Sequence, residues 1–118
     1  MRHHFENLDV WKRSLELSIN IYQVLKSCKD YGLKDQMERA SVSIPSNIAE
    51  GSQRSSEKDF VRFLYIAKGS AAELNTQLKI AFRLSYISKQ TEINLSNELN
   101  EIIDMLSGLI KTLSKRTQ

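Results

Sequence analysis

The sequence predicts an all-α protein, an antiparallel up-down four-helix bundle that forms a single domain over residues 1–118. Four long segments carry apolar residues at helical spacing, and the connections between them are short. Only 4 glycines and 1 proline are present to interrupt these segments, and 41% hydrophobic with 26% charged residues is the composition of a folded globular chain. We expect mobile tails at about residues 1–7 and 114–118.

The first helix is expected from about Val10 to Ser27, with Asp9 as its N-cap. Apolar residues cover more than half of its circumference and leave a narrow polar strip. This helix therefore carries more apolar surface than one core can bury.

The second helix is expected to begin near Leu33 and to end at the turn-forming residues 51–56. Pro45 lies inside it, removes one backbone donor and clashes with the preceding turn. We therefore expect a kink, or a break and restart, around Ser41 to Pro45.

The third helix is expected from Ser55 or Ser56, either of which can cap it, to about Tyr86. The fourth is expected over residues 91–113, where leucines and isoleucines repeat at coiled-coil spacing.

Side chains that usually carry catalysis are scarce. His3 and His4 both lie in the N-terminal tail, so no imidazole is held within the bundle for a catalytic triad, a zinc site or a di-iron site. Cys28 is the only cysteine, which excludes an internal disulfide and indicates the reducing cytoplasm. We expect no enzyme, no cofactor and no metal, and the absence of a long apolar run predicts no membrane segment.

Acidic residues at Glu98, Glu101 and Asp104 are spaced like a metal or acid–base cluster. Their helical positions lie on the polar side of the apolar seam, so we interpret them as a solvated face.

A basic face is the first candidate binding site. Between residues 54 and 89 there are seven Lys/Arg and three Asp/Glu, whereas residues 92–104 hold four acids and no base. On an ideal third helix beginning near residue 54, six basic side chains project opposite the apolar stripe and could follow a phosphate backbone. The alternative is an ordinary solvated face that pairs with acids of another helix. The six are Arg54, Lys58, Arg62, Lys68, Lys79 and Arg83.

A candidate oligomer interface lies on the same helix face. Glycine inside a helix costs about 1 kcal/mol relative to alanine, so a mid-helix glycine indicates a crowded contact or a close backbone approach. With the surplus apolar surface of the first helix, this predicts a homo-oligomer. The residues of this interface are Trp11, Val61, Tyr65, Gly69 and Ala72.

Four stretches together resemble a known family: Ser-Ile-Pro-Ser-Asn-Ile-Ala-Glu-Gly at residues 43–51, residues 63–70, residues 73–78 and the opening residues 5–11. The chain resembles the bacterial four-helix bundle proteins, also called 23S ribosomal RNA intervening-sequence proteins. The resemblance implies a ring-shaped homopentamer and no catalytic residues. A related branch, similar to the accessory variability determinant of diversity-generating retroelements, implies RNA or DNA and a reverse transcriptase as partners.

Residues 43–51 also have a structural explanation. Pro45 sets a bend, Ser46 and Asn47 can bond the freed backbone groups, and Gly51 ends the helix. We interpret the segment as structural; if it held a ligand site, Asn47 and Glu50 would be the candidates.

Two functions follow from these observations. The first is a non-enzymatic oligomer that binds RNA, DNA or a nucleic-acid enzyme through the basic face. The second is a structural oligomer or protein adaptor that binds no nucleic acid. Steep salt dependence of nucleic-acid binding is expected only for the first.

Overall fold

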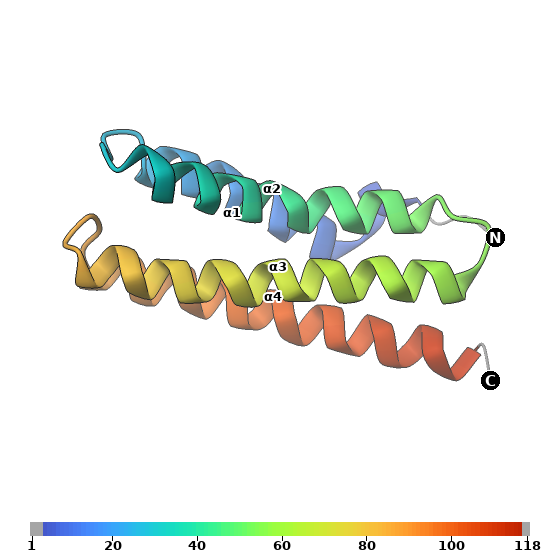
Figure 1. Ribbon diagram of the computed structural model, residues 1–118. Helices are drawn as coiled ribbons and strands as arrows, with labels where there is room; N and C mark the ends of the chain where they lie inside the picture. Colours follow the sequence, from blue (N-terminus) through green and yellow to red (C-terminus); the bar gives the residue numbers. More distant parts are fainter. Residues whose placement is uncertain (1–3, 117–118) are drawn as a thin grey trace.

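The computed structural model describes residues 4–116, which form a bundle of four long α-helices measuring 47 × 20 × 19 Å (Figure 1). The elements, in chain order, are the short 3-10 helix η1 (Phe5–Asn7), α1 (Asp9–Val24), α2 (Tyr31–Ser52), α3 (Glu57–Arg83) and α4 (Lys89–Arg116).

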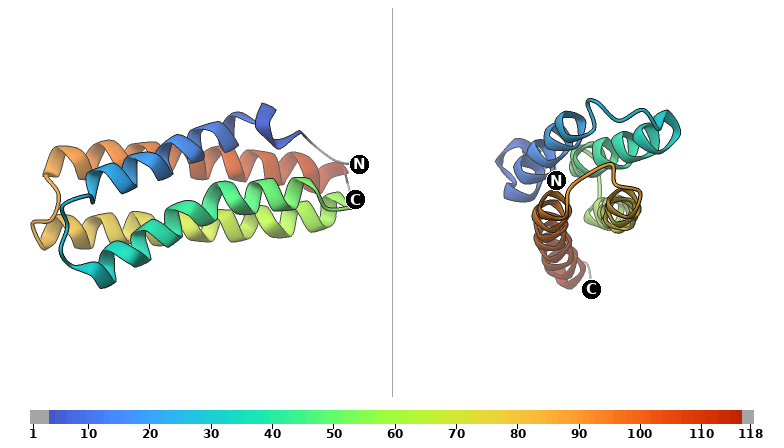
Figure 2. Two further views of the ribbon diagram at one scale, coloured as in Figure 1. Left: turned by 90° about the horizontal axis from the view of Figure 1, so that it is seen from above. Right: turned by 90° about the vertical axis from the view of Figure 1, so that its left-hand side faces the viewer.

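Consecutive helices run antiparallel, so the α1–α2 and α3–α4 connections lie at one end of the bundle and the α2–α3 turn lies at the other (Figures 1 and 2). The contact between α2 and α3 is the most extensive, and that between α1 and α4 is the least extensive of the four helix–helix contacts. The prediction of an all-α, up-down four-helix arrangement is confirmed.

One hydrophobic core receives side chains from all four helices. The predicted apolar stripes of α3 and α4 face it, whereas α1 buries only part of its apolar surface. The largest fully buried side chains are Phe60, Leu17, Ile21, Leu25, Met37, Ile44, Ile48, Leu64, Leu74, Leu78, Leu99 and Ile102.

A kink, or a break and restart, was expected at Pro45; helix α2 is continuous through this proline, so the break is wrong. Ile44 and Ile48 on either side of the proline are fully buried, and their packing holds the helix although one backbone hydrogen bond is lost. The Asn47 side chain adds a hydrogen bond from its amide nitrogen to the Ser43 carbonyl, at 2.8 Å.

The last turn of α2 requires a glycine for close packing against α3. A Cβ atom on Gly51 would lie 2.6 Å from Cβ of Phe63 and 3.0 Å from Cδ1 of Phe60. Ser56 then caps α3 by accepting a hydrogen bond from the Asp59 amide at 3.1 Å, as predicted.

Helix α3 ends earlier than expected, at Arg83, in a Schellman motif. Ser85 has φ 64°, its amide donates to the Phe82 carbonyl, and the Tyr86 amide donates to the Ala81 carbonyl. A serine in this left-handed conformation gives no sequence signal for the turn, because glycine is the usual residue there.

Structure extends into both predicted tails. Phe5 packs edge-on against Trp11 with 5.2 Å between ring centroids, and Arg116 of α4 pairs with Glu57 at 3.2 Å. The remaining tail residues, 1–3 and 117–118, lie outside the described residues.

Candidate nucleic-acid interface

The six predicted basic residues lie on or beside the outer face of α3. Lys58, Arg62, Lys79 and Arg83 are exposed on the helix, and Lys68 is half-buried. Because α3 begins at Glu57, the sixth residue, Arg54, lies in the preceding turn and not on the helix.

Two of the six are engaged within the molecule. The Arg54 guanidinium pairs with Glu50 at 2.9 Å and lies 4.6 Å from the centre of the Phe63 ring. Lys79 donates to the Ser96 hydroxyl at 3.3 Å and lies 3.6 Å from a carboxylate oxygen of Glu92. These contacts match the alternative in which basic residues pair with acids of another helix.

The other four have no such partner. Lys58, Arg62, Lys68 and Arg83 make no ion pair or hydrogen bond with any residue in the described range 4–116. Their charges are therefore available to a ligand.

Glu92 of α4 contacts two lysines at the C-terminal end of the basic face. Its side chain is only 6% exposed, and its second oxygen accepts from Lys89 at 3.0 Å. The hydrogen bond from Lys89 is the main cause that lowers the pKa of Glu92, and the charge of Lys79 acts in the same direction against the effect of burial. Glu92 is thus a stable anion between two lysines.

The predicted oligomer residues fall into two groups. Trp11 and Val61 are half-buried and pack against the core of their own chain. Tyr65 is 56% exposed, Gly69 and Ala72 are exposed, and nothing lies within 4 Å of a Cβ built on Gly69. The crowded contact expected at Gly69 is therefore not made within the chain.

Three further apolar side chains are exposed on the same face and were not singled out from the sequence. Ile66, Ile80 and Leu84 are 44–51% exposed. Their helical spacing from Tyr65 was the sequence pattern that could have placed them on this exposed face. Helix α1 exposes apolar side chains as well, among them Ile19 and Tyr22, in agreement with its predicted surplus of apolar surface.

The acidic cluster on α4 binds an arginine of α1. Arg13 makes a bidentate contact with Glu98, at 2.8 and 2.6 Å, and a third bond to Glu101 at 2.9 Å. These bonds raise the pKa of Arg13, chiefly through Glu98. Asp104 is exposed and has no part in this contact. Sequence reasoning missed Arg13 because pairing across α1 and α4 depends on how the helices face one another.

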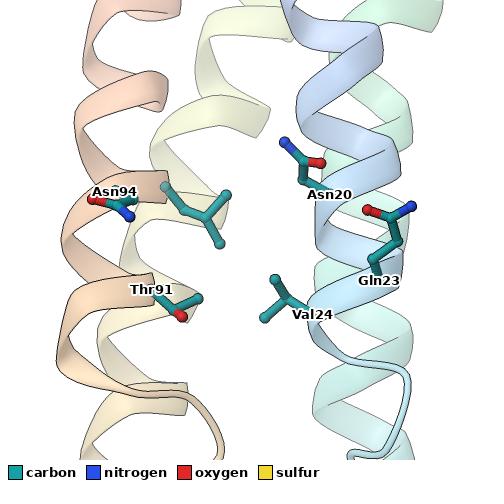
Figure 3. Close-up of a pocket in the computed structure, with 6 residues that line it drawn as sticks. Asn20, Gln23, Val24, Thr91 and Asn94 are labelled. Atoms are coloured by element: carbon teal, nitrogen blue, oxygen red, sulfur yellow. The ribbon is translucent and has the colours of Figure 1, made fainter.

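A pocket of about 220 Å³ lies between α1 and α4 (Figure 3). Val24 of α1 and Thr91 of α4 point toward one another across it. Its lining is uncharged, so it is not part of the basic face. The lining residues are Asn20, Gln23, Val24, Thr91, Asn94 and Leu95.

Asn47 and Glu50, the candidates within residues 43–51, both have structural contacts. The Asn47 amide donates to the carbonyl and the hydroxyl of Ser43, and Glu50 pairs with Arg54. Across the α2–α3 contact, the hydroxyls of Ser43 and Ser70 are hydrogen-bonded at 2.9 Å.

Other candidate chemistry is limited in the part of the chain that the structure describes. His4 is exposed, Cys28 is half-buried, and His3 lies outside the described residues. Residues 4–116 hold no group of three His, Cys, Asp or Glu placed to bind a metal ion. None of the described helices is long and apolar enough to span a bilayer.

Comparison with known proteins finds one matching family and a solved structure with a similar fold. A family model for the 23S rRNA-intervening sequence protein matches residues 6–108. The crystal structure of a protein of unknown function from the S23 ribosomal protein family of Bacteroides thetaiotaomicron VPI-5482 is 32% identical, with a TM-score of 0.82. The match covers 86% of this chain and 98% of that one. No curated protein matches the chain.

Proposed function

The chain belongs to the 23S rRNA-intervening sequence protein family, and from this premise we propose that it is a non-enzymatic, cytoplasmic protein that binds RNA through the outer face of α3. The observation that carries the proposal is the set of four unpartnered basic side chains on this face, Lys58, Arg62, Lys68 and Arg83. A cation without an internal partner can release counterions from a phosphate backbone without first breaking an ion pair. A nucleic-acid-processing enzyme such as a reverse transcriptase is a further candidate partner.

Salt dependence of RNA binding tests the proposal. We expect labelled single-stranded RNA to bind at low salt and to be released as salt rises, with the logarithm of affinity falling by about 0.7 per phosphate neutralised for each decade of salt. The double variant Lys58→Gln/Arg62→Gln should weaken binding and reduce this slope by about 1.4. Fluorescence anisotropy measures both quantities.

The matched control removes two charges elsewhere. Lys12 on α1 and Lys111 on α4 are exposed and lie off the α3 face, so Lys12→Gln/Lys111→Gln should leave the slope nearly unchanged. Equal losses in the two double variants would mean that net charge alone binds RNA, and no binding at low salt would favour the structural oligomer.

We propose further that the protein assembles with copies of itself, with the homopentamer implied by the family resemblance as the expected state. Support comes from Tyr65 and Ile66, which are exposed beside Gly69 on α3. The Gly69 position is open within the chain, so the backbone of another copy can approach it between these exposed apolar side chains. Basic residues of neighbouring copies would then line a shared groove.

Two glycines provide a matched test of this assembly. Gly69 and Gly108 are both exposed inside long helices, with nothing within 4 Å of an added Cβ. We expect Gly69→Glu to lower the mass measured by light scattering, and Gly108→Glu to leave it unchanged. An unaltered mass in Gly69→Glu, or a monomeric starting protein, would exclude this interface.

A further inference from the structure

The cleft between the last turns of α3 and the first turn of α4 gathers charged groups from two helices. It has a volume of about 370 Å³ and is lined by Lys79, Phe82, Arg83, Lys89 and Glu92. Three cations and one carboxylate give these side chains a net charge of +2. A phosphate group carries the complementary charge.

Two of the three cations, the lysines, have internal partners before any ligand arrives. Glu92 binds Lys89 through one oxygen and Lys79 through the other, and Lys79 also donates to Ser96. The Lys89 ammonium lies 4.6 Å from the centre of the Phe82 ring. Side chains that are already ordered lose less conformational entropy on binding, which favours affinity.

Hydrogen-bond donors remain free in this arrangement. An ammonium group has three N–H donors, and neither lysine uses all of them in the contacts above. Arg83 lies four residues after Lys79 on α3, and its guanidinium donors make no hydrogen bond or ion pair within residues 4–116. Glu92 is almost fully covered, so a ligand meets the cations rather than the carboxylate.

An apolar surface adjoins the charged cleft. A second hollow of about 320 Å³ is lined by Thr76, Lys79, Ile80, Arg83 and Leu84, so Lys79 and Arg83 border both. The exposed side chains of Ile80 and Leu84 lie immediately beside the cationic groups. Together the two hollows suit a molecule that joins a phosphate to a flat or apolar group.

We infer that this cleft binds one nucleotide unit, with its phosphate among Arg83, Lys79 and Lys89 and its base or sugar on Ile80 and Leu84. The inference rests on the proposed function in taking an RNA strand as the source of the nucleotide. It adds that one end of the basic face holds a phosphate at a fixed position, whereas Lys58 and Arg62 attract the strand without such a cleft.

Nuclear magnetic resonance of the full, isotopically labelled chain tests the inference with three probes: inorganic phosphate, uridine monophosphate and a short oligouridine. We expect uridine monophosphate to shift the amide signals of residues 79–92 saturably and to bind more tightly than inorganic phosphate. Arg83→Gln should weaken its binding by about tenfold or more, since hydrogen bonds to charged groups carry that much free energy. Arg83 has no internal partner, so this variant keeps the fold.

Arg62→Gln is the matched control, because Arg62 is an exposed, unpartnered arginine on the same face of α3 but outside the cleft. It should leave the affinity for uridine monophosphate unchanged. Equal losses in Arg62→Gln and Arg83→Gln, or signal shifts spread over the whole face, would overturn the inference. Equal affinities for inorganic phosphate and uridine monophosphate would overturn the placement of the base or sugar.

The oligouridine separates this inference from the proposed function. Salt-sensitive oligouridine binding that weakens in Arg62→Gln and not in Arg83→Gln would overturn the cleft and leave RNA binding intact. Binding of uridine monophosphate in the cleft with no oligouridine binding at low salt would overturn RNA binding and identify the free nucleotide as the ligand.

Discussion

The contact between α2 and α3 and the contacts made by α4 hold the bundle together by different means. At the α2–α3 contact the helices approach closely at Gly51, and the polar groups between them are the uncharged hydroxyls of Ser43 and Ser70. Helix α4 is joined to its neighbours by ion pairs in addition to its leucine seam. These pairs are Arg13–Glu98, Arg13–Glu101, Lys79–Glu92 and Glu57–Arg116.

The α2–α3 contact thus depends on the shapes of the packed groups, whereas the contacts of α4 depend partly on charge. Close packing is sensitive to a single added methyl group and insensitive to salt or pH. Ion pairs tolerate small movements but weaken with salt, and with the protonation of the acid. Substitutions that change side-chain volume should therefore weaken the α2–α3 contact most. Changes in salt concentration or pH should weaken the contacts of α4 most.

The largest expected effect is that of Gly51→Ala at the α2–α3 contact. The added methyl would lie 2.6 Å from Cβ of Phe63, an atom that a side-chain rotation cannot move away, so one helix must shift. We expect a loss of about 3 kcal/mol in unfolding free energy, measured with denaturant and independent of salt. Gly108→Ala, in open space on α4, should instead gain about 1 kcal/mol. Similar values for the two variants would show that the α2–α3 contact is not tightly packed.

Glu92→Gln is expected to lower the free energy of unfolding by a smaller amount, which depends on pH. Because the folded pKa of Glu92 lies below its ordinary value of 4.5, the ionised carboxylate stabilises the fold above that pH. This contribution is lost as the pH falls through the folded pKa. We expect the variant to be less stable than the natural protein by about 1 kcal/mol at neutral pH, and the gap to narrow below pH 4.5. A gap that stays constant down to acid unfolding would contradict the ion-pair role of Glu92.

The smallest expected effect on the free energy of unfolding is that of the ion pair at the α1–α4 contact. Arg13 and Glu98 are each about one-third exposed, so solvent screens their bidentate pair. A double-mutant cycle of Arg13→Met and Glu98→Gln should give a coupling free energy of about 0.5 kcal/mol that disappears in molar salt. Because Arg13→Met largely preserves the packing of the arginine stem, coupling that persists in molar salt would contradict a solvent-screened ion pair at this contact.

Much of this fold could be predicted from the sequence because helical periodicity and capping act locally. The leucines and isoleucines of α4 and the Ser56 cap of α3 are examples. Pro45 was misleading in one respect, since a kink or a break was expected and tertiary packing keeps α2 continuous, without the break. Ser85 could not be predicted to end α3, because its left-handed backbone depends on the surrounding turn rather than on the residue type.

The candidate site could be predicted only as a set of residue types on one helix face. Periodicity placed Lys58, Arg62 and Arg83 on the exposed side of α3, where they lie. It could not show that Lys79 pairs with Glu92, because that contact crosses to another helix. The cleft beside Arg83 likewise exists only after α3 and α4 are packed together.

The hydroxyl pair between Ser43 and Ser70 fixes the register of α2 against α3. A slide by one helical turn, about 5.4 Å, would separate the two hydroxyls and would carry Gly51 away from Phe63. We therefore expect α2 and α3 to keep this register and to behave as one unit. Any change of shape on binding is therefore expected as a swing of α1 or α4 about that unit, with the α1–α4 pocket as the place that widens or closes.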